Sequence, residues 1–575
     1  MRKIFIAAIL FYSSILCSCK NNSEKSTVNN AVVVYYNGDI LTMEGDQPEY
    51  AEALVVKDGK IIFVGNKDEA MKQAGEGHQM IDLNGKTLLP GFIDGHSHIT
   101  KYADGLMQAD LSSPPLGKIN NISDIIKSMQ DLKVKLKADD TSWIIGFNYD
   151  QDLLSEKRHP TAADLDVAFP TNPVILMHVS GHMLVANSIA LKKVGINADT
   201  KDPAGGTIIR KKGTTEPEGL LQEVAQQIFI PFLFKPIPIE QELEKLKSAQ
   251  QYYASNGVTT AAEHLAFPEK MVILDSAAAR KELFIDIETL PAYTIADKIV
   301  GNKNFKWGTF NNHLKYTGIK MAVDGSPQGK TAFLTQAYLT EVPGCSHDCK
   351  GFPNLNQEQI NQLLVLCYKN KVQVYSHCNG DASIDMMIKG HENAIALTGD
   401  STTDRRTVII HSQIMRPDQL MAYKKYKLFP SFFTNHCYYW GDAHLENLGK
   451  ERADFISPMK SAFDMGIICT NHTDCAVTPM DQLFLLWTSV ARETKSGKVL
   501  GEAQKITPYQ GLKALTINGA YEYFEENSKG SLKAGKLADL VILSKNPLKV
   551  DVNDIKNIKV VETIKEGKSV FAEKQ

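Results

Sequence analysis

Two histidines separated by one residue follow an apolar run in the N-terminal part of the chain. The run is LLPGFID at 88–94, and His96 and His98 come directly after it. Alternate side chains of a strand share a face, so the two rings should point the same way, roughly 7 Å apart along the backbone. Two neutral imidazoles aimed at one point are half of a transition-metal site. A polar strand end with two solvated histidines is the simpler alternative.

Further polar side chains lie within or just after other apolar segments. Eight segments of strand type, separated by helical patterns, lie at 88–94, 257–263, 285–290, 318–323, 372–376, 407–410, 428–433 and 466–470. Eight such strands close a (β/α)8 barrel, in which the chemistry takes place at the carboxyl ends of the strands. The candidate metal ligands at those positions are His96, His98, Lys320, His377, His411 and Asp474.

These residue types suit metal-assisted hydrolysis. Three or four imidazoles hold a divalent metal and leave one position open for a water molecule, whose pKa the metal lowers. Asp474 is placed to take the proton from that water and return it to the leaving nitrogen, which makes it the candidate catalytic residue. Alternatively, Asp474 only caps the helix that follows it. The expected cofactor is a divalent metal, zinc by preference, as one or two ions.

Lys320 is unusual because it lies inside an apolar strand, IKMAV at 319–323. A buried amine is costly unless it is paired or chemically altered. A carbamate formed with carbon dioxide would turn the amine into a carboxylate that can bridge two metals. The alternatives are a side chain that reaches the barrel rim and an ion pair with Asp324.

Both ends of the chain have sequence patterns typical of short strands separated by turns. Residues 31–88 and 528–575 are therefore predicted to form one composite β-sandwich domain, beside a barrel at 89–527. The long gap after the first barrel strand must hold an insertion, at about 108–250. The predicted fold is α/β, a (β/α)8 TIM barrel with a small β-sandwich domain built from both termini and an insertion after the first barrel strand.

The N-terminus has the composition of an export signal. Arg2 and Lys3 precede an apolar run that ends in LCSC at 16–19, so residues 1–18 are predicted to be a signal peptide and residues 19–30 a polar tether. This ending resembles a bacterial lipobox. The resemblance implies a lipid on Cys19 that anchors the protein to a membrane of the bacterial cell envelope, in the periplasm or at the outer membrane. A plain signal peptide is the alternative.

The overall composition indicates which classes of binding partner are favoured. A formal net charge of −3 over 575 residues, with no basic tract, does not favour nucleic acid as a partner, and a small-molecule substrate is expected. The sequence is also compatible with a homodimer. Cys345 and Cys349 lie in a loop rich in Gly and Pro, where an exported protein could form a local disulfide.

Taken together, these residues resemble the amidohydrolase superfamily of metal-dependent hydrolases. The superfamily has a His-x-His after the first strand, a frequently carbamylated lysine on the fourth, single histidines on the fifth and sixth and an aspartate on the eighth. The matching residues are His96, His98, Lys320, His377, His411 and Asp474. A narrower resemblance is to the YtcJ-like branch, which includes N-substituted formamide deformylases. It is carried by GFNYDQDLL from 146, SGHMLVANSIAL from 180, MAVDGSPQGKTA from 321 and HTDCAVTPMD from 472.

The narrower resemblance also implies substrate contacts from the insertion. Asn148, Asp150 and His182 are the candidate substrate-binding residues there, with Glu223 as a further acidic side chain; packing within the insertion is the alternative. His436 is a fourth candidate, because it lies in the aromatic segment NHCYYW at 435–440. That segment is interpreted as a substrate-contact loop, with a packed aromatic cluster as the alternative.

The sequence therefore predicts a lipid-anchored, metal-dependent amidohydrolase that cleaves an amide or formamide bond of a small molecule through a metal-bound hydroxide. A deaminase or an ester hydrolase would use the same residues. A non-catalytic, ligand-binding surface lipoprotein that keeps the barrel as a scaffold is the alternative from another class. A metal-dependent isomerase or decarboxylase is a third.

Overall fold

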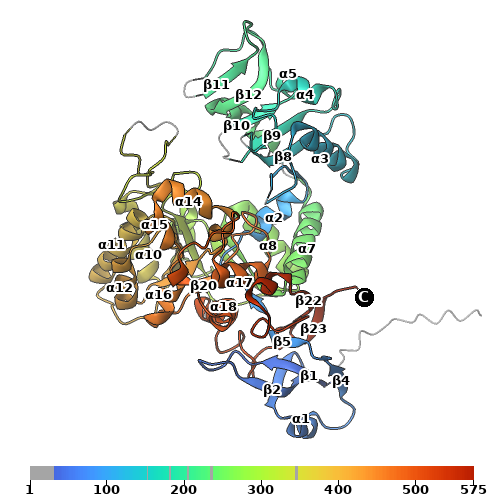
Figure 1. Cartoon of the computed structure of the whole chain (residues 1–575), viewed down its shortest axis with the longest axis vertical. Coiled ribbons are helices and arrows are strands. Elements are labelled where there is room, and N and C mark those ends of the chain that lie inside the picture. Colours follow the sequence, from blue (N-terminus) through green and yellow to red (C-terminus); the bar gives the residue numbers. More distant parts are fainter. Residues whose placement is uncertain are drawn as a thin grey trace, which may run out of the picture.

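The computed structural model describes residues 32–574 apart from 115, 152, 180–182, 204–205, 234–236 and 343–346. The predicted signal peptide, the tether with Cys19, and His182 lie outside the described residues. Figure 1 shows three parts, a central barrel, a lobe above it and a small sheet below it. Within the described ranges, no helix is long and apolar enough to cross a membrane.

Parallel strands in two hydrogen-bonded arcs form the barrel wall. The first arc contains β6 (Phe92–Ile93), β13 (Val258–Ala266), β14 (Asp286–Pro291) and β15 (Leu314–Tyr316). The second contains β16 (Gly318–Ala322), β17 (Gln373–Cys378), β18 (Val408–His411), β19 (Phe429–Phe432) and β20 (Thr470–Asn471). Only Thr317 separates β15 from β16, so these two segments are one bent fourth strand that joins the arcs.

Two backbone hydrogen bonds link the segments that follow the first and the last barrel strand. Asp474 N–H donates to the carbonyl of His96 at 3.1 Å, and His98 N–H donates to the carbonyl of Cys475 at 2.7 Å. They join the free edges of the two arcs just beyond β6 and β20. The predicted (β/α)8 barrel is confirmed.

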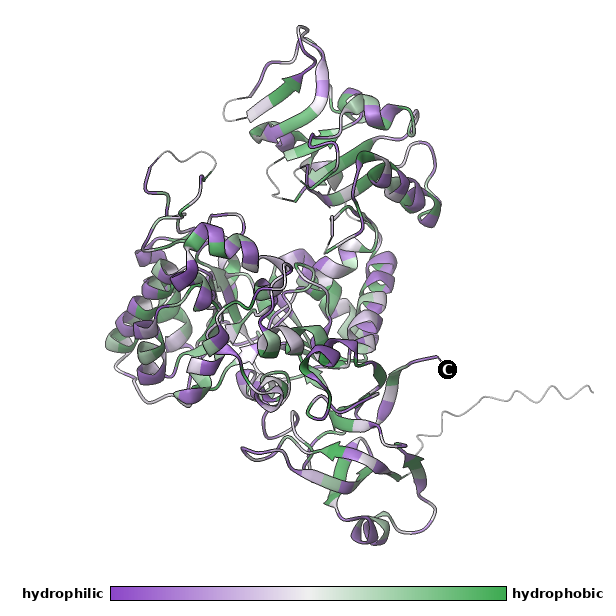
Figure 2. Cartoon of the chain, viewed as in Figure 1, coloured by the Kyte–Doolittle hydropathy of each residue, from purple (hydrophilic) through white to green (hydrophobic). Residues whose placement is uncertain are grey.

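Helices surround this wall. They include α7 (Ile239–Ser255), α8 (Pro268–Ala279), α10 (Gln357–Lys369), α11 (Asp381–Thr398), α12 (Pro417–Tyr426), α16 (Met459–Asp464), α17 (Gln482–Ala491), α18 (Pro508–Ala514) and α19 (Ile517–Glu522). Figure 2 shows polar residues along the outer helices and apolar residues along the strands. Leu246 and Tyr253 of α7 are buried in the same core as the barrel strands. Helix α7 therefore packs with the barrel, although its residues 239–250 fall within the range 108–250 expected for the insertion.

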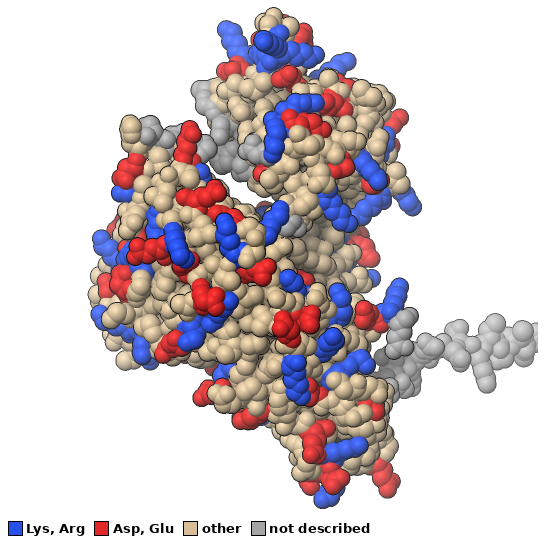
Figure 3. Space-filling model, in the orientation of Figure 1, with Lys and Arg blue, Asp and Glu red and all other residues tan. Residues whose placement is uncertain are grey.

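The inserted lobe has a sheet and a core of its own. Its strand order is β11-β12-β10-β9-β8-β7, and its largest helix is α3 (Ile122–Lys135). The strands are β7 (Ala109–Asp110), β8 (Ile144–Tyr149), β9 (Val174–His178), β10 (Met183–Ala186), β11 (Gly206–Arg210) and β12 (Pro217–Glu223). Figure 3 shows a hollow between this lobe and the body, and charges of both signs interspersed on the visible face.

Strands from both ends of the chain lie in one further sheet, with the order β23-β22-β21-β5-β1-β2-β3 and β4 beside β1. From the N-terminal end come β1 (Val33–Leu41), β2 (Tyr50–Lys57), β3 (Lys60–Gly65), β4 (Gln79–Asp82) and β5 (Thr87–Pro90). From the C-terminal end come β21 (Leu540–Leu543), β22 (Val560–Lys565) and β23 (Lys568–Ala572). Helix α1 (Lys67–Ala74) packs on β2 through Ala70 and Ala74.

The prediction of one barrel strand over 88–94 is wrong, because the chain changes sheets within it. Strand β5 pairs with β1 and β21 of the terminal sheet, and only β6 belongs to the barrel. Gly91 lies at the crossing, where a Cβ atom would come within 2.3 Å of the Thr259 Cγ2 atom. Any side chain at this position would therefore clash with the second barrel strand.

Cys349 is disulfide-bonded, and its predicted partner Cys345 lies outside the described residues. Five other described cysteines are free and buried.

Buried ion pairs join the terminal sheet to the amino-terminal end of the barrel. Asp286, at the start of β14, receives hydrogen bonds at Oδ2 from Lys529 and from Lys565, the latter at 2.7 Å. Lys565 also donates to Asp539 at 2.8 Å. Burial alone would raise the pKa of Asp286, but the two lysines outweigh burial and hold that pKa well below its ordinary value.

We expect Lys565→Met to destabilise the protein by about 3–5 kcal/mol, because two buried carboxylates lose a shared cation. Lys568→Met, at an exposed position of β23, is the matched control. The free energy of unfolding from urea titration measures the difference. Because the pKa of Asp286 is depressed, this stability should be present at neutral pH and be lost as pH falls into the acid range. Equal stability of the two variants would contradict this account.

Candidate metal centre

Three side chains that follow the first and the last strand of the barrel converge at its mouth. Nε2 of His96 lies 3.3 Å from Oδ1 of Asp474, and Nε2 of His98 lies 3.4 Å from the same oxygen. All three atoms lie within 4.8 Å of one another. The hydrogen bonds that link 96–98 to 474–475 fix this convergence, because they hold the two segments side by side.

His411 and His377 extend the cluster along β18 and β17. Nε2 of His411 lies 3.9 Å from Oδ2 of Asp474, and the ring centroids of His411 and His377 are 4.6 Å apart. Nδ1 of His377 lies 3.2 Å from Oδ1 of Asp324. The structure therefore brings four predicted histidines and Asp474 into one cluster.

Backbone strain accompanies two of these residues. His411 has φ 71° and Asp474 has φ 52°, both in the left-handed region. For residues other than glycine such a conformation costs on the order of 1–3 kcal/mol and persists only where the surroundings impose it.

Burial and mutual contact set the protonation states of the cluster. Burial lowers the pKa of His96 and of His411 well below the ordinary value for imidazole. Burial alone would raise the pKa of Asp474, but the surrounding histidines, with the His98 hydrogen bond first, outweigh it and hold that pKa well below its ordinary range. Neutral imidazoles beside an ionised carboxylate are the forms that bind a metal.

Lys320 is fully buried beneath the cluster on β16. Burial lowers the pKa of its amine to about 7, although Asp474 opposes the shift. Among the described residues, its Nζ has no hydrogen-bond partner.

The alternative of an ion pair between Lys320 and Asp324 is wrong. The Asp324 carboxylate accepts hydrogen bonds from the backbone N–H groups of Asn379 and Gly380, at 2.9 Å and 2.8 Å, and from the Ser383 hydroxyl at 2.9 Å. With His377 also in contact, that carboxylate is fully used in holding β17 and the start of α11.

Two buried histidines in this cluster were not among the predicted ligands. The ring centroid of His472 lies 5.0 Å from those of His96 and of His411. Nδ1 of His264 lies 2.6 Å from Nδ1 of His96. His264 directly follows the predicted second strand at 257–263, so the strand-end rule that selected the other ligands could have found it.

The predicted substrate-binding residues lie in two places. Asn148, which is exposed at the end of β8, and Asp150, which follows that strand, belong to the inserted lobe above the barrel in Figure 1. Glu223 ends β12 of the same lobe. His436 lies in the barrel body, buried, with its Nδ1 3.0 Å from Nε2 of His444 and its ring centroid 4.7 Å from that of Phe433. The structure therefore places His436 beside the cluster, within electrostatic range of Asp474 and His472, and places Asn148 and Asp150 in the inserted lobe.

A second trio, Asp286, His313 and Glu566, has metal-ligand spacing at the opposite end of the barrel. It suits a cation poorly, because Oδ1 of Asp286 already accepts from His313 at 2.7 Å and Oδ2 accepts from two buried lysines. Among the described residues, no lysine or arginine forms an ion pair with the Asp474 carboxylate at the mouth. Imidazole nitrogens with one carboxylate oxygen are a donor set for a divalent transition metal.

Fold and donor set define a barrel of the metal-dependent hydrolase type. The chain belongs to the amidohydrolase family, whose sequence model matches residues 79–571. The predicted resemblance is thereby confirmed, and the donor set fits the divalent metal of metal-dependent hydrolases.

Several relatives are similar over most of their length. The chain is 28% identical to Protein LONG AFTER FAR-RED 3 of Arabidopsis thaliana, over 93% of this chain and 91% of that protein. It is 25% identical to the putative amidohydrolase YtcJ of Bacillus subtilis, over 94% and 99%. It is also 25% identical to the N-substituted formamide deformylase of Arthrobacter pascens, over 92% and 96%. The fold matches that of an uncharacterised metal-dependent hydrolase from Pyrococcus furiosus with a TM-score of 0.72, at 22% identity over 90% and 100% of the two chains.

We expect His98→Ala to remove most of the bound divalent metal, because it deletes one of three converging donor atoms. Elemental analysis of purified protein measures the metal content per chain. His313→Ala, in the trio at the opposite end of the barrel, is the control and should keep the wild-type content. Metal retained by His98→Ala and lost by His313→Ala would place the ion at the wrong end of the barrel.

Proposed function

We propose that this protein is a metal-dependent amidohydrolase that hydrolyses an amide or formamide bond of a small molecule. The observation that carries the proposal is the convergence of His96 Nε2 and His98 Nε2 on Asp474 Oδ1 at the mouth of a hydrolase-type barrel. Similarity to a formamide deformylase over nearly the whole chain supports this class of bond.

A bound divalent metal, for which zinc is proposed as one or two ions, would polarise the carbonyl and make water a nucleophile near neutral pH. His96 and His98 with Asp474 would hold one ion, and His377 and His411 would hold a second. Asp474 takes a proton from the attacking water and delivers it to the nitrogen that leaves when the carbon–nitrogen bond breaks. The low pKa of its carboxyl keeps it ionised before each turnover.

Carbamylation of Lys320 would complete a two-metal site. With a pKa near 7, a large share of the amine is neutral at physiological pH and has the lone pair needed to attack carbon dioxide. The new N–C bond gives a carbamate, and the nitrogen releases one proton to solvent. The product is an anion with two oxygens, in place of an amine that is buried without a hydrogen-bond partner among the described residues.

The remaining roles belong to the same proposal. His436 would contact the substrate from the barrel body, and Asn148, Asp150 and His182 would contact it from the inserted lobe. A lipid on Cys19 would anchor the protein in the bacterial cell envelope. A homodimer is compatible with these roles.

A hydrolysis screen over N-formyl, N-acyl and cyclic amide compounds, with metal-loaded protein, tests the function. Release of formate or another carboxylate with the amine is the expected result. Release of ammonia from an amidine or aminopurine would instead identify a deaminase, and turnover without incorporation of oxygen from water would identify an isomerase or decarboxylase.

On any substrate found in that screen, we expect Asp474→Asn to lower kcat by about 10²–10⁴-fold, because the amide cannot carry the proton. Asp464→Asn, which removes an exposed carboxylate on α16 that pairs with Lys460, is the matched control. Full turnover by Asp474→Asn with its metal retained would refute the assigned role.

We expect protein reconstituted with metal in ¹³C-bicarbonate to show a carbamate carbonyl signal in its ¹³C NMR spectrum. The reason is that the buried amine of Lys320 would become an anionic carbamate, which bound divalent metal would stabilise. Lys320→Met should lack the signal, and protein prepared in carbon dioxide-depleted buffer should bind less metal. An unchanged spectrum in Lys320→Met would assign the signal to another group.

A further inference from the structure

His264 is buried in contact with a metal ligand but has no nitrogen left to bind metal itself. Its Nδ1 faces Nδ1 of His96 at 2.6 Å, and its Nε2 faces the hydroxyl of Tyr523 at 3.3 Å. All three side chains are buried, on β13, after β6 and after α19 respectively. The contact therefore has a function other than ligation.

The direction of each hydrogen bond follows from the Tyr523 end. The Tyr523 hydroxyl lies 3.2 Å from the carbonyl oxygen of Asp94 and 3.1 Å from that of Gly95. Carbonyls only accept, so the hydroxyl donates its single hydrogen to this pair. Its oxygen is then left to accept from His264, which must carry its hydrogen on Nε2.

The tautomer of His96 follows in turn. A neutral imidazole carries one ring hydrogen, and that of His264 is on Nε2 facing Tyr523, so its Nδ1 is a bare acceptor. His96 must then donate through Nδ1–H across the 2.6 Å contact. Its Nε2 is left with a lone pair that points at Oδ1 of Asp474, 3.3 Å away.

The His96 Nε2 lone pair and Asp474 Oδ1 are both acceptors, and at 3.3 Å they repel each other unless a cation lies between them. We propose that His264, held by Tyr523, is a positioning residue that fixes the tautomer of His96 and keeps its Nε2 lone pair directed at the metal. This inference rests on the proposed function, since it assigns His96 as a ligand. Outer partners of this kind orient first-sphere ligands, and their loss typically costs 10–100-fold in metal affinity.

Three variants test the inference by the dissociation constant for Zn²⁺, measured by competition with a chromophoric chelator. His264→Leu removes the acceptor and should weaken binding by about 10–100-fold. His264→Asn places an amide oxygen near the position of Nδ1 and should bind close to wild type. Tyr523→Phe leaves His264 free to switch tautomer and should weaken binding by less than His264→Leu does. It also keeps the test decisive if the leucine variant does not fold.

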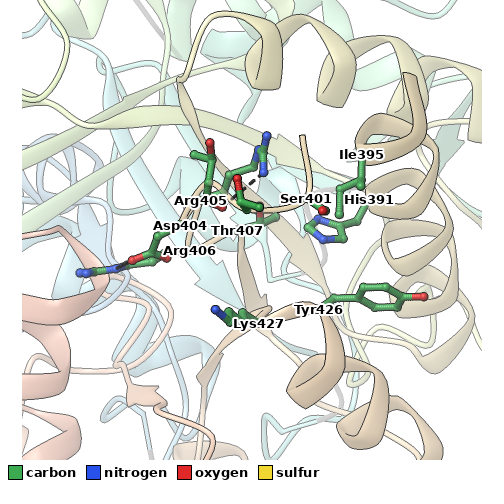
Figure 4. Close-up of a pocket in the computed structure, with 11 residues that line it drawn as sticks. His391, Ile395, Ser401, Asp404, Arg405, Arg406, Thr407, Tyr426 and Lys427 are labelled. Atoms are coloured by element: carbon green, nitrogen blue, oxygen red, sulfur yellow. Dashed lines mark hydrogen bonds and ion pairs between the residues drawn. The ribbon is translucent and has the colours of Figure 1, made fainter. Parts of the chain in front are cut away.

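The matched control is another buried histidine that contacts a tyrosine. His391 on α11 is also buried, and its Nδ1 lies 2.5 Å from the Tyr368 hydroxyl. Figure 4 shows His391 in a small polar pocket beside Arg405 and Thr407, at the amino-terminal end of β18 and so at the barrel end opposite the metal cluster. His391→Leu should therefore leave the Zn²⁺ dissociation constant unchanged.

The visible spectrum of the Co²⁺-loaded protein is a second readout, independent of activity. It should change in His264→Leu and be restored in His264→Asn. Equal affinities and spectra for wild type and His264→Leu, or equal losses in the leucine and asparagine variants, would overturn the role of His264 and leave the metal site intact. A wild-type protein that binds no Zn²⁺ would overturn the proposed function together with this inference.

Discussion

The seam between the first and last barrel strands is the constraint on which the site depends. His96, His98 and Asp474 lie in segments almost 380 residues apart, and two backbone hydrogen bonds hold those segments side by side. Without this closure the three donor atoms would have no common centre. Closure of the barrel therefore also assembles the candidate metal cluster, although its segments contribute little regular structure of their own.

Burial gives these groups their chemistry. A dry environment keeps the imidazoles neutral, and their mutual contact keeps Asp474 ionised. The same environment lowers the pKa of Lys320 to about 7 and so turns an inert ammonium into a partly neutral amine. At the other end of the barrel, three buried lysines are instead paired with carboxylates, Lys315 with Glu525, Lys529 with Asp286 and Lys565 with both Asp286 and Asp539. Pairing makes that end structural, whereas the Lys320 amine near the mouth has no hydrogen-bond partner among the described residues.

The barrel and most of the candidate metal ligands could be predicted from the sequence, because each apolar segment that ends in histidine or aspartate can be recognised by itself. The exceptions have physical causes. The run at 88–94 looks continuous, yet Pro90-Gly91 moves the chain from one sheet to another, and only the contact of Gly91 with Thr259 shows why. The orientation of Asp324 toward His377 rather than Lys320 depends on the backbone N–H groups of Asn379 and Gly380, just before α11, which no local pattern reveals. His264 follows an apolar strand as the ligands do, but its contact with His96 joins residues 168 positions apart.

The most direct test of the account is anomalous diffraction from crystals of the metal-loaded protein, recorded on both sides of the zinc absorption edge. The account predicts an anomalous peak at the barrel mouth, bonded to Nε2 of His96, Nε2 of His98 and a carboxylate oxygen of Asp474. A peak beside Asp286, His313 and Glu566 instead, or no peak at the mouth in crystals soaked with zinc, would contradict it.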